Sequence, residues 1–160
     1  MAIRIIVTKG DDILTKKCKE VKEINKKILD LLDDMRDTLY YQGNGIGLAA
    51  PQVGMLKRLV VIDIGEGLME LINPVIVEQE GEQSDIEGCL SIPGVYGRVK
   101  RPARVVVEYK NRKGQKVRKE GTGLLAICLS HELDHLDGIL FDQKAYEFVD
   151  IEKEEKEKKG

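Results

Sequence analysis

Apolar residues recur at helical spacing in two stretches of the chain. The first stretch predicts a core-packing helix over about residues 25–41, with Asn25 as the N-cap and Gly43 as the terminator. A second helix is expected over residues 124–136, where Gly138 takes a C-cap role. The apolar stripe of the first helix consists of Ile24, Ile28, Leu31, Leu32, Met35 and Leu39.

Between these helices the pattern changes to short β-prone runs. Strands are expected over residues 59–64, 68–80, 104–109 and 116–119, with a hairpin turn at 111–114. Shorter β-prone runs lie at residues 3–7 and 139–141. Within residues 68–80, Pro74 has no N–H group for a strand ladder, so it should mark an edge or a bend. The pattern therefore predicts a strand-rich middle flanked by two helices.

The composition is that of a single globular domain, expected over residues 1–160. Charged residues make up 34% of the 160 residues and apolar residues 42%. The net charge of −2 gives no reason to expect strong binding to nucleic acid or a membrane. No apolar run approaches the ~20 residues of a membrane span, and the N-terminus is charged too early for a signal peptide. A cytoplasmic location is the default expectation. Residues 150–160, almost entirely Lys and Glu, are typical of a solvated helix or frayed tail.

The strongest candidate for chemistry is the sequence His131-Glu132-Leu133-Asp134-His135 in the second expected helix. It reads H-E-x-x-H and contains the only two histidines of the chain. Residues four apart on a helix point the same way, so the two imidazoles can converge on one metal ion. Glu132 lies at the edge of that face, where its carboxylate can reach a metal-bound water. Such sites usually have a third protein ligand and one position open to water.

The three cysteines are candidates for that third ligand. Their odd number and wide spacing favour reduced thiols over a disulfide framework. Cys18 lies in a charged connector and is expected to be a partly exposed thiol. Cys128 is on the helical stripe, but it lies ~10 Å of helical rise from His135, and its side chain leans away from the metal. Asp134 lies between the histidines in sequence, but its Cβ projects away from their shared face. Cys89 can approach the helix from a different segment and ranks first among side chains, with other carboxylates left open.

Two further stretches have unusual backbone requirements. Gly45 to Ala50 matches a dinucleotide-binding pattern, but a helix precedes it and Pro51 follows it, which excludes that interpretation. A glycine-rich loop remains, and by itself it favours a tight turn with an exposed Gln52. The stretch from Glu87 to Gly94 holds Cys89 in constrained, non-helical backbone, and most free cysteines in such places are small buried residues.

Taken together, these stretches resemble the peptide deformylases. The family shows G-x-G-L-A-A-x-Q, E-G-C-L-S and H-E-x-D-H motifs in this order. The chain has Gly45-Ile46-Gly47-Leu48-Ala49-Ala50-Pro51-Gln52, Glu87-Gly88-Cys89-Leu90-Ser91 and His131-Glu132-Leu133-Asp134-His135. The resemblance extends from the first helix to about Phe141. It implies an α+β fold in which antiparallel β-sheets surround a central helix carrying H-E-x-x-H, with a long N-terminal helix.

The resemblance also implies roles for individual residues. The metal ligands would be Cys89, His131 and His135, and the general base would be Glu132. Gln52 and the backbone N–H of Leu90 would hold the developing oxyanion. The remaining implied contacts are with the peptide backbone and the methionine side chain, through Ile46, Gly47, Gly88, Leu124, Ile127 and Cys128.

The implied activity is removal of the formyl group from N-formylmethionyl nascent chains, with release of formate. One divalent ion is implied, Fe²⁺ natively, with Zn²⁺, Ni²⁺ or Co²⁺ as alternatives in the same geometry. Some bacterial members dock on the ribosome through a longer basic C-terminal helix; the tail here is short and charge-balanced, which leaves a transient ribosome contact open. A Gly10-Asp11-Asp12 sequence replaces the Pro-Asp-Pro type of turn common near the N-terminus.

Three other interpretations are compatible with parts of these motifs. A small zinc endopeptidase also uses H-E-x-x-H, but usually takes its third ligand from a downstream Glu or His. A non-catalytic binding module would be expected to lose Glu132 or Gln52 first. A structural metal site usually has four protein ligands and no adjacent base.

Overall fold

The computed structural model describes residues 2–43 and 45–151. The described chain forms two antiparallel sheets and two α-helices, with short 3-10 helices in the connections. The helices are α1 (Lys26–Gln42) and α2 (Gly123–Leu136), and the 3-10 helices are η1 (Asp12–Thr15), η2 (Ala50–Val53) and η3 (Phe141–Gln143). The strands are β1 (Gly47–Ala49), β2 (Leu59–Ile62), β3 (Met69–Glu80), β4 (Gln83–Cys89), β5 (Ile92–Arg101), β6 (Arg104–Lys110), β7 (Lys116–Thr122) and β8 (Glu147–Phe148).

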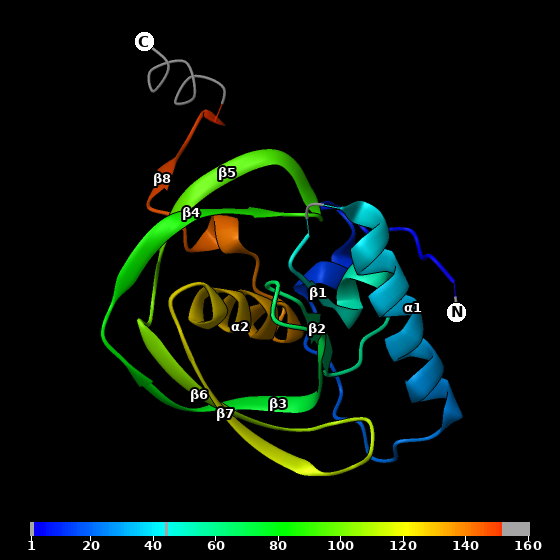
Figure 1. The fold of residues 1–160 in the computed structure, drawn as a ribbon. Coiled ribbons are helices and arrows are strands. Elements are labelled where there is room, and N and C mark those ends of the chain that lie inside the picture. Colours follow the sequence, from blue (N-terminus) through cyan, green and yellow to red (C-terminus); the bar gives the residue numbers. More distant parts are fainter. Residues whose placement is uncertain (1, 44, 152–160) are drawn as a thin grey trace.

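Helix α2 lies in the middle of the molecule, enclosed by strands (Figure 1). The larger sheet has the strand order β1-β2-β3-β6-β7, and the smaller sheet has the order β4-β5-β8. Helix α1 packs beside β1 and β2, away from α2. No helix in the described part of the chain is long and apolar enough to cross a membrane.

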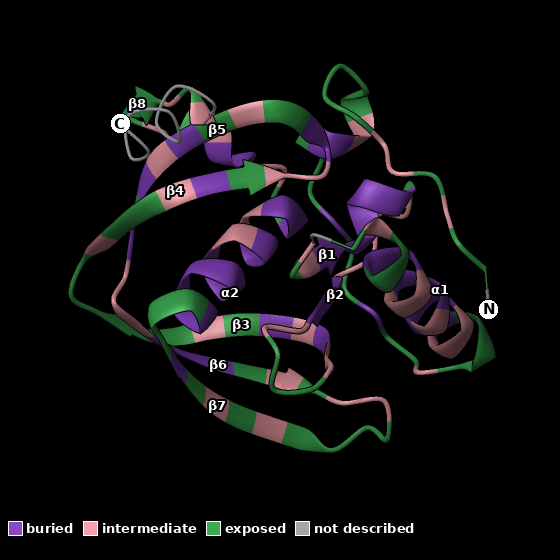
Figure 2. Cartoon of the chain, turned by 45° about the horizontal axis from the view of Figure 1, so that its top comes forward, coloured by how far each residue is buried: buried purple, intermediate pink, exposed green. Residues whose placement is uncertain are grey.

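Strand β2 divides the core because both of its faces are buried. Val60 and Ile62 pack in the cluster that contains α2, whereas Leu59 and Val61 pack in the cluster that contains α1. Alternate side chains of a strand point to opposite faces, so a short apolar run is buried on both sides. Each such side chain contributes roughly 1.5–3 kcal/mol by leaving water. Burial accordingly follows the inner surfaces of the elements, while β3, β6 and β7 of the larger sheet also carry exposed residues (Figure 2).

Helix α1 begins and ends where the sequence predicts, within one residue. The Asn25 side chain accepts a hydrogen bond from the Ile28 N–H at 3.1 Å, which satisfies one of the free donors of the first turn. Gly43 ends the helix in the left-handed conformation at φ 76°, where a residue without a Cβ atom is favoured. The stripe expected from the sequence faces the core, since Leu31, Leu32 and Met35 are all buried.

Several local expectations were wrong. Residues 3–7 form no strand, and residues 139–141 lead into η3 instead of a strand. For Pro74 the expected bend is confirmed by a register shift between Ile72 and Val75, but β3 continues through it in the interior of the sheet and not at an edge. Cys18 is buried, with 8% exposed, because it packs in the same cluster as α2.

The β4–β5 hairpin is the main element that periodicity did not predict. Its strands contain Gly88, Pro93, Gly94 and Gly97, residue types depleted from strands. Some of these glycines are required because a neighbouring segment leaves no room for a Cβ atom. A Cβ atom at Gly97 would lie 2.8 Å from Cβ of Ala145, so glycine allows the chain that enters β8 to pass close by. Residues 152–160, most of the expected charged tail, lie outside the described part of the chain.

Candidate active site

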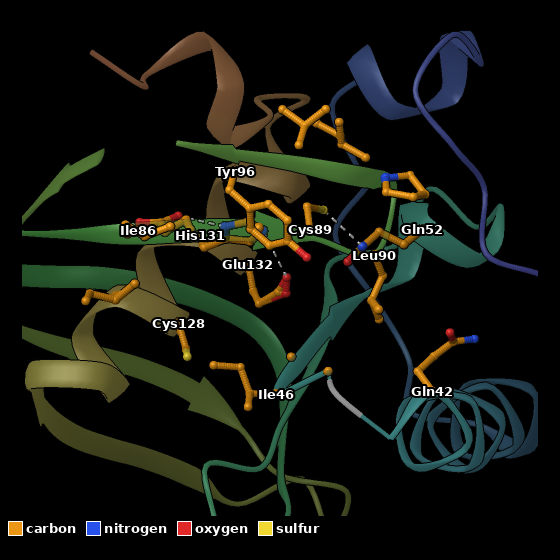
Figure 3. Close-up of a pocket in the computed structure, with 18 of the residues that line it drawn as sticks. Gln42, Ile46, Gln52, Ile86, Cys89, Leu90, Tyr96, Cys128, His131 and Glu132 are labelled. Atoms are coloured by element: carbon orange, nitrogen blue, oxygen red, sulfur yellow. Dashed lines mark hydrogen bonds and ion pairs between the residues drawn. The ribbon is translucent and has the colours of Figure 1, made fainter. Parts of the chain in front are cut away.

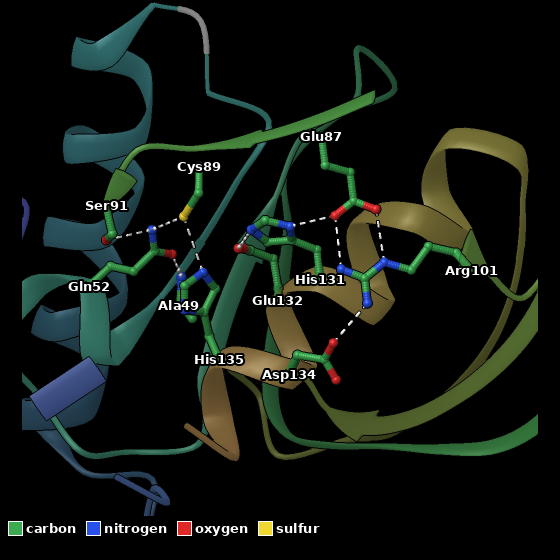
Figure 4. Close-up of polar contacts among 10 residues, drawn as sticks. All are labelled: Ala49, Gln52, Glu87, Cys89, Ser91, Arg101, His131, Glu132, Asp134 and His135. Carbon is green, nitrogen blue, oxygen red and sulfur yellow. Dashed lines mark hydrogen bonds and ion pairs between the residues drawn. The ribbon is translucent and has the colours of Figure 1, made fainter. Parts of the chain in front are cut away.

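The two histidines of α2 and Cys89 of β4 come together at one point. Cys89 Sγ lies 3.3 Å from Nε2 of His135, and the two histidine rings are 5.1 Å apart between centroids. One ligand atom from each of these three residues lies within 4.8 Å of the other two. The turn between β4 and β5 brings Cys89 to the helix from the side, as Figure 4 shows.

The remaining candidates for a third ligand lie elsewhere. Asp134 points away from the histidines and binds Arg101 at 2.7 Å and Lys144 at 2.9 Å. Cys128 does not belong to the group formed by Cys89 and the histidines. Burial raises the pKa of the Cys128 thiol to about 12, so the thiolate that metals bind is disfavoured there.

The donor set fits a divalent metal ion. A tetrahedral ion bound to one thiolate and one imidazole holds sulfur and nitrogen roughly 3.5 Å apart, close to the 3.3 Å between Cys89 and His135. Burial lowers the pKa of His135 well below its usual value, which keeps the imidazole neutral and able to coordinate. At His131 burial would lower the pKa, but hydrogen bonds with Cys89 and Glu87 raise it to about 10. The anionic surroundings of His131 therefore attract positive charge, as a proton or as a metal cation.

A buried ionic network orients His131. Its Nδ1 lies 2.8 Å from Oε1 of Glu87, which leaves Nε2 directed towards Cys89 and His135 (Figure 4). Arg101 binds both oxygens of Glu87 at 2.8 Å and also binds Asp134. Burial would raise the pKa of Glu87, but the hydrogen bonds from Arg101 and His131 outweigh it and hold the pKa below its usual range. The Glu87 carboxylate therefore stays ionised between the Arg101 guanidinium and the His131 imidazole.

The carboxyl group of Glu132 lies buried beside the three candidate ligands. Its Oε1 lies 3.9 Å from Nε2 of His131, and its buried Oε2 has no hydrogen-bond partner among the described residues. Burial raises the pKa of this carboxyl to about 7. A Cβ atom at Gly47 would lie 2.9 Å from Cγ of Glu132, so the carboxylate rests directly against the glycine backbone of β1.

Gln52 is buried beside Cys89 and not exposed as the isolated loop suggested. Its side chain is 1% exposed, because η2 turns it inwards against the β4–β5 turn. Its Oε1 accepts a hydrogen bond from the Ala49 N–H at 2.9 Å, and its Nε2 lies 3.6 Å from Cys89 Sγ. The amide nitrogen therefore faces the candidate metal ligands.

A cleft of about 710 Å³ opens over these groups, a size typical of sites for small ligands. Figure 3 shows Ile46, Leu90 and Cys128 around it, with Glu132 and His131 at its base. Every site residue predicted from the sequence lines it, apart from the fully buried His135. The predicted lining residues are Ile46, Gly47, Gln52, Gly88, Cys89, Leu90, Leu124, Ile127, Cys128, His131 and Glu132.

The sequence did not indicate several residues of this site. Arg101 and Asp134 act at a distance from the cleft, and no local pattern pairs them with Glu87. Tyr96 lies against Gly88, where a Cβ atom would meet its ring at 2.7 Å. Glu87 and Asp134 carried a usable signal, because they lie inside the E-G-C-L-S and H-E-x-D-H motifs, whereas Arg101 and Tyr96 lie in no motif.

In this fold an H-E-x-x-H helix meets a cysteine from a β-hairpin, a combination of donors and an adjacent carboxylate that is typical of metal-dependent hydrolases. A model of the polypeptide deformylase family matches residues 3–150. The peptide deformylase of Acetivibrio thermocellus is 63% identical over 160 residues, covering 100% of this chain and 94% of that protein. The peptide deformylase of Thermoanaerobacter pseudethanolicus is 57% identical over 158 residues, covering 99% of each chain.

Solved structures agree with these relatives. The peptide deformylase of Thermotoga maritima superposes with a TM-score of 0.88 at 36% identity, covering 91% of this chain and 99% of that one. A peptide deformylase from Synechococcus elongatus, solved in complex with actinonin, gives a TM-score of 0.84 at 43% identity, covering 88% and 77%. The chain belongs to the polypeptide deformylase family. It is a metal-dependent enzyme that removes the N-formyl group from newly synthesised proteins.

Proposed function

We propose that Cys89, His131 and His135 hold the catalytic metal and that the H-E-x-x-H segment of α2 is the centre of the reaction. The observation that carries this proposal is the convergence of the three side chains beside the cleft, which Cys89 and His131 line and behind which His135 is buried. A divalent ion held there would supply Lewis acidity and lower the pKa of a water ligand from ~15.7 towards ~7. The native ion we propose is Fe²⁺, with Zn²⁺, Ni²⁺ or Co²⁺ able to use the same ligands.

Glu132 moves the proton in this proposal. Its unpartnered Oε2 is free to accept a proton from the attacking water, whose oxygen bonds to the formyl carbon. The same carboxyl then gives the proton to the departing amine nitrogen as the carbon–nitrogen bond breaks. The products are formate and a peptide with a free N-terminal methionine. One carboxyl group can perform both transfers because it lies close to both atoms in turn.

Two donors stabilise the negative charge on the formyl oxygen. They are Nε2 of Gln52, which faces Cys89, and the backbone N–H of Leu90 in the turn after β4. A single donor of this kind can contribute ~3–4 kcal/mol to the transition state. Both donors are fixed before the reaction, since Gln52 is buried and Leu90 lies in the hairpin turn.

The peptide chain of the substrate is proposed to lie between two strand edges. Strands β1 and β4 are the edge strands of their sheets, and residues of both line the cleft. Backbone groups near Ile46, Gly47 and Gly88 can therefore pair with an extended peptide. The apolar side chains of Leu124 and Ile127, together with Cys128, form a wall suited to methionine.

The cellular setting follows from the substrate. We propose that residues 1–160 act as a single deformylase domain, with a charged tail from about residue 150, and that the enzyme works in the cytoplasm, where formylated chains are made. A transient ribosome contact by that tail falls on residues outside the described part of the chain.

The decisive test is formate release from a formyl-Met peptide by protein purified without air, with metal analysis of the same sample. Formate release and bound iron are expected, and an identical peptide that lacks the formyl group serves as the control. Cleavage of internal bonds in an unblocked protein would favour the endopeptidase instead. Binding of the formyl peptide without formate would contradict a catalytic role.

A further inference from the structure

Ser91 is a fully buried polar residue of the site to which the mechanism above gives no part. It follows Leu90 in the turn between β4 and β5, and none of its surface is exposed. Its Oγ lies 3.2 Å from Nε2 of Gln52, as Figure 4 shows. Ser91 therefore contacts the residue that is proposed to hold the oxyanion.

The Gln52 amide can donate a hydrogen bond towards the cleft in only one of its two orientations. Its oxygen accepts hydrogen bonds and its nitrogen donates two. The Ala49 N–H is a donor, so it requires Oε1 on its side and turns Nε2 towards Cys89 and Ser91. The Ser91 hydroxyl accepts one N–H of Nε2, so the other N–H points to the side of Cys89, whose Sγ lies 3.6 Å away and which lines the cleft.

The backbone holds Ser91 and Gln52 at a fixed separation. The carbonyl of Gln52 accepts a hydrogen bond from the Val7 N–H at 2.7 Å, and the carbonyl of Ser91 accepts one from the Lys9 N–H at 2.8 Å. One short segment near the N-terminus thus joins η2 to the β4–β5 turn. The two side chains meet because both of their backbones are tied to that segment.

We propose that Ser91 is a positioning residue that fixes the direction of the Gln52 amide, so that one N–H points to the formyl oxygen in the transition state. Ser91 does not touch the substrate and acts only through Gln52. This inference rests on the proposed oxyanion role of Gln52. It predicts that the Ser91 hydroxyl affects the rate of the chemical step and not the binding of metal or peptide.

The first test is the Ser91→Ala variant, assayed for formate release and for metal content. We expect kcat to fall about 10-fold, as for the loss of one hydrogen bond of ~1.4 kcal/mol in the transition state, while KM and bound metal stay within about 2-fold. The matched control is Ser130→Ala, because Ser130 is also buried but its Oγ has no hydrogen-bond partner among the described residues. The control variant should keep the kcat of the unmodified enzyme.

A double-mutant cycle separates positioning from simple packing. Gln52→Ala should lower kcat by ~10²–10³, and adding Ser91→Ala to that variant should change kcat less than 2-fold. If the two effects multiply instead, Ser91 does not act through Gln52 and the inference is wrong. If Gln52→Ala has no effect on kcat, the oxyanion assignment in the proposed function is what fails.

A second substitution covers the case in which Ser91→Ala does not fold. Ser91→Cys fills similar space and offers a weak acceptor in place of the hydroxyl. Its kcat should lie between those of the unmodified enzyme and the alanine variant, and the same cycle with Gln52→Ala can be run on it. A kcat equal to that of the unmodified enzyme, in a folded Ser91→Ala protein, would overturn the proposal directly.

Discussion

Glu87 Oε1 and His131 Nδ1 lie 2.8 Å apart, although 44 residues separate them in the chain. The same carboxylate is bound through both oxygens by Arg101, whose side chain is 2% exposed. One buried anion thus connects a candidate metal ligand to a buried cation. The stability of the core and the orientation of His131 consequently depend on the same few atoms.

Replacing Arg101 with Met should destabilise the protein strongly. The substitution leaves the Glu87 carboxylate buried without its cation, and breaking a buried pair in this way typically costs roughly 3–5 kcal/mol. Urea unfolding followed by circular dichroism measures the loss. Arg118→Met is the control, because the Arg118 side chain is 54% exposed and its pairs with Glu78 and Glu108 are screened by water. Equal losses in the two variants would contradict the importance of burial.

Replacing Cys89 with Ala should remove the metal, whereas Cys128→Ala should retain it. Only Cys89 lies with both histidines, at 3.3 Å from His135. Metal analysis after gel filtration distinguishes the two variants, which lose the same thiol group from neighbouring positions in the site. Metal loss from Cys128→Ala with retention in Cys89→Ala would reverse the ligand assignment.

Replacing Glu132 with Gln should keep the metal and remove most turnover. The amide has nearly the shape of the carboxyl group but cannot accept the proton, and general acid–base groups typically contribute 10²–10⁴-fold, so kcat should fall by about that factor. Formate release and metal content are measured on the same sample. Glu66→Gln serves as the control, because Glu66 is exposed in the turn after β2. Full activity of Glu132→Gln would refute the role of Glu132.

Replacing Gly47 with Ala should lower kcat without loss of metal. The added Cβ atom would lie 2.9–3.0 Å from the Glu132 side chain, so the carboxyl group must shift. A misplaced proton acceptor slows the reaction, and a displacement of ~1 Å can cost ~10²-fold. A formate assay and a melting curve show whether the loss is catalytic. An unchanged kcat would mean that Glu132 tolerates the displacement.

The buried thiol of Cys18 should make the protein less stable at alkaline pH. Burial raises the pKa of this thiol from 9.0 to about 11, despite the opposing charge of Arg58. Below pH 9 the thiol is protonated in both states and its contribution is complete. Between pH 9 and 11 the unfolded state loses the proton first, so up to roughly 3 kcal/mol of unfolding free energy is lost.

Unfolding free energies of the unmodified protein and of Cys18→Ala, measured from pH 8 to 11, test this expectation. The variant starts with a lower stability because a buried side chain is truncated, but its stability should fall less across this range. Lysine and tyrosine titration affects both proteins, so the difference between the two curves isolates the thiol. Parallel curves would show that the Cys18 thiol titrates normally in the folded protein.

Elements that depend on neighbouring residues could be predicted from the sequence. The stripe from Ile24 to Leu39 predicted α1 because burial of one helical face requires that spacing, and the cap at Asn25 is a contact within one turn. The spacing of His131 and His135 predicted two imidazoles on one face of α2, because residues four apart in a helix point the same way. The helical rise of ~10 Å between Cys128 and His135 likewise follows from the sequence alone and keeps the Cys128 thiol away from a metal between the two histidines.

Contacts between groups far apart in the sequence became known only from the folded structure. The β4–β5 hairpin is rich in glycine and has no clear alternation, so its strands are defined by pairing and by neighbours such as Ala145 and not by propensity. Arg101 and Asp134 carry no local sign of their contact with Glu87. The loop pattern predicted an exposed Gln52, but in the folded chain its side chain is buried against the turn that contains Ser91. Contacts between segments far apart in sequence depend on the packing of the whole chain, so local periodicity cannot predict them.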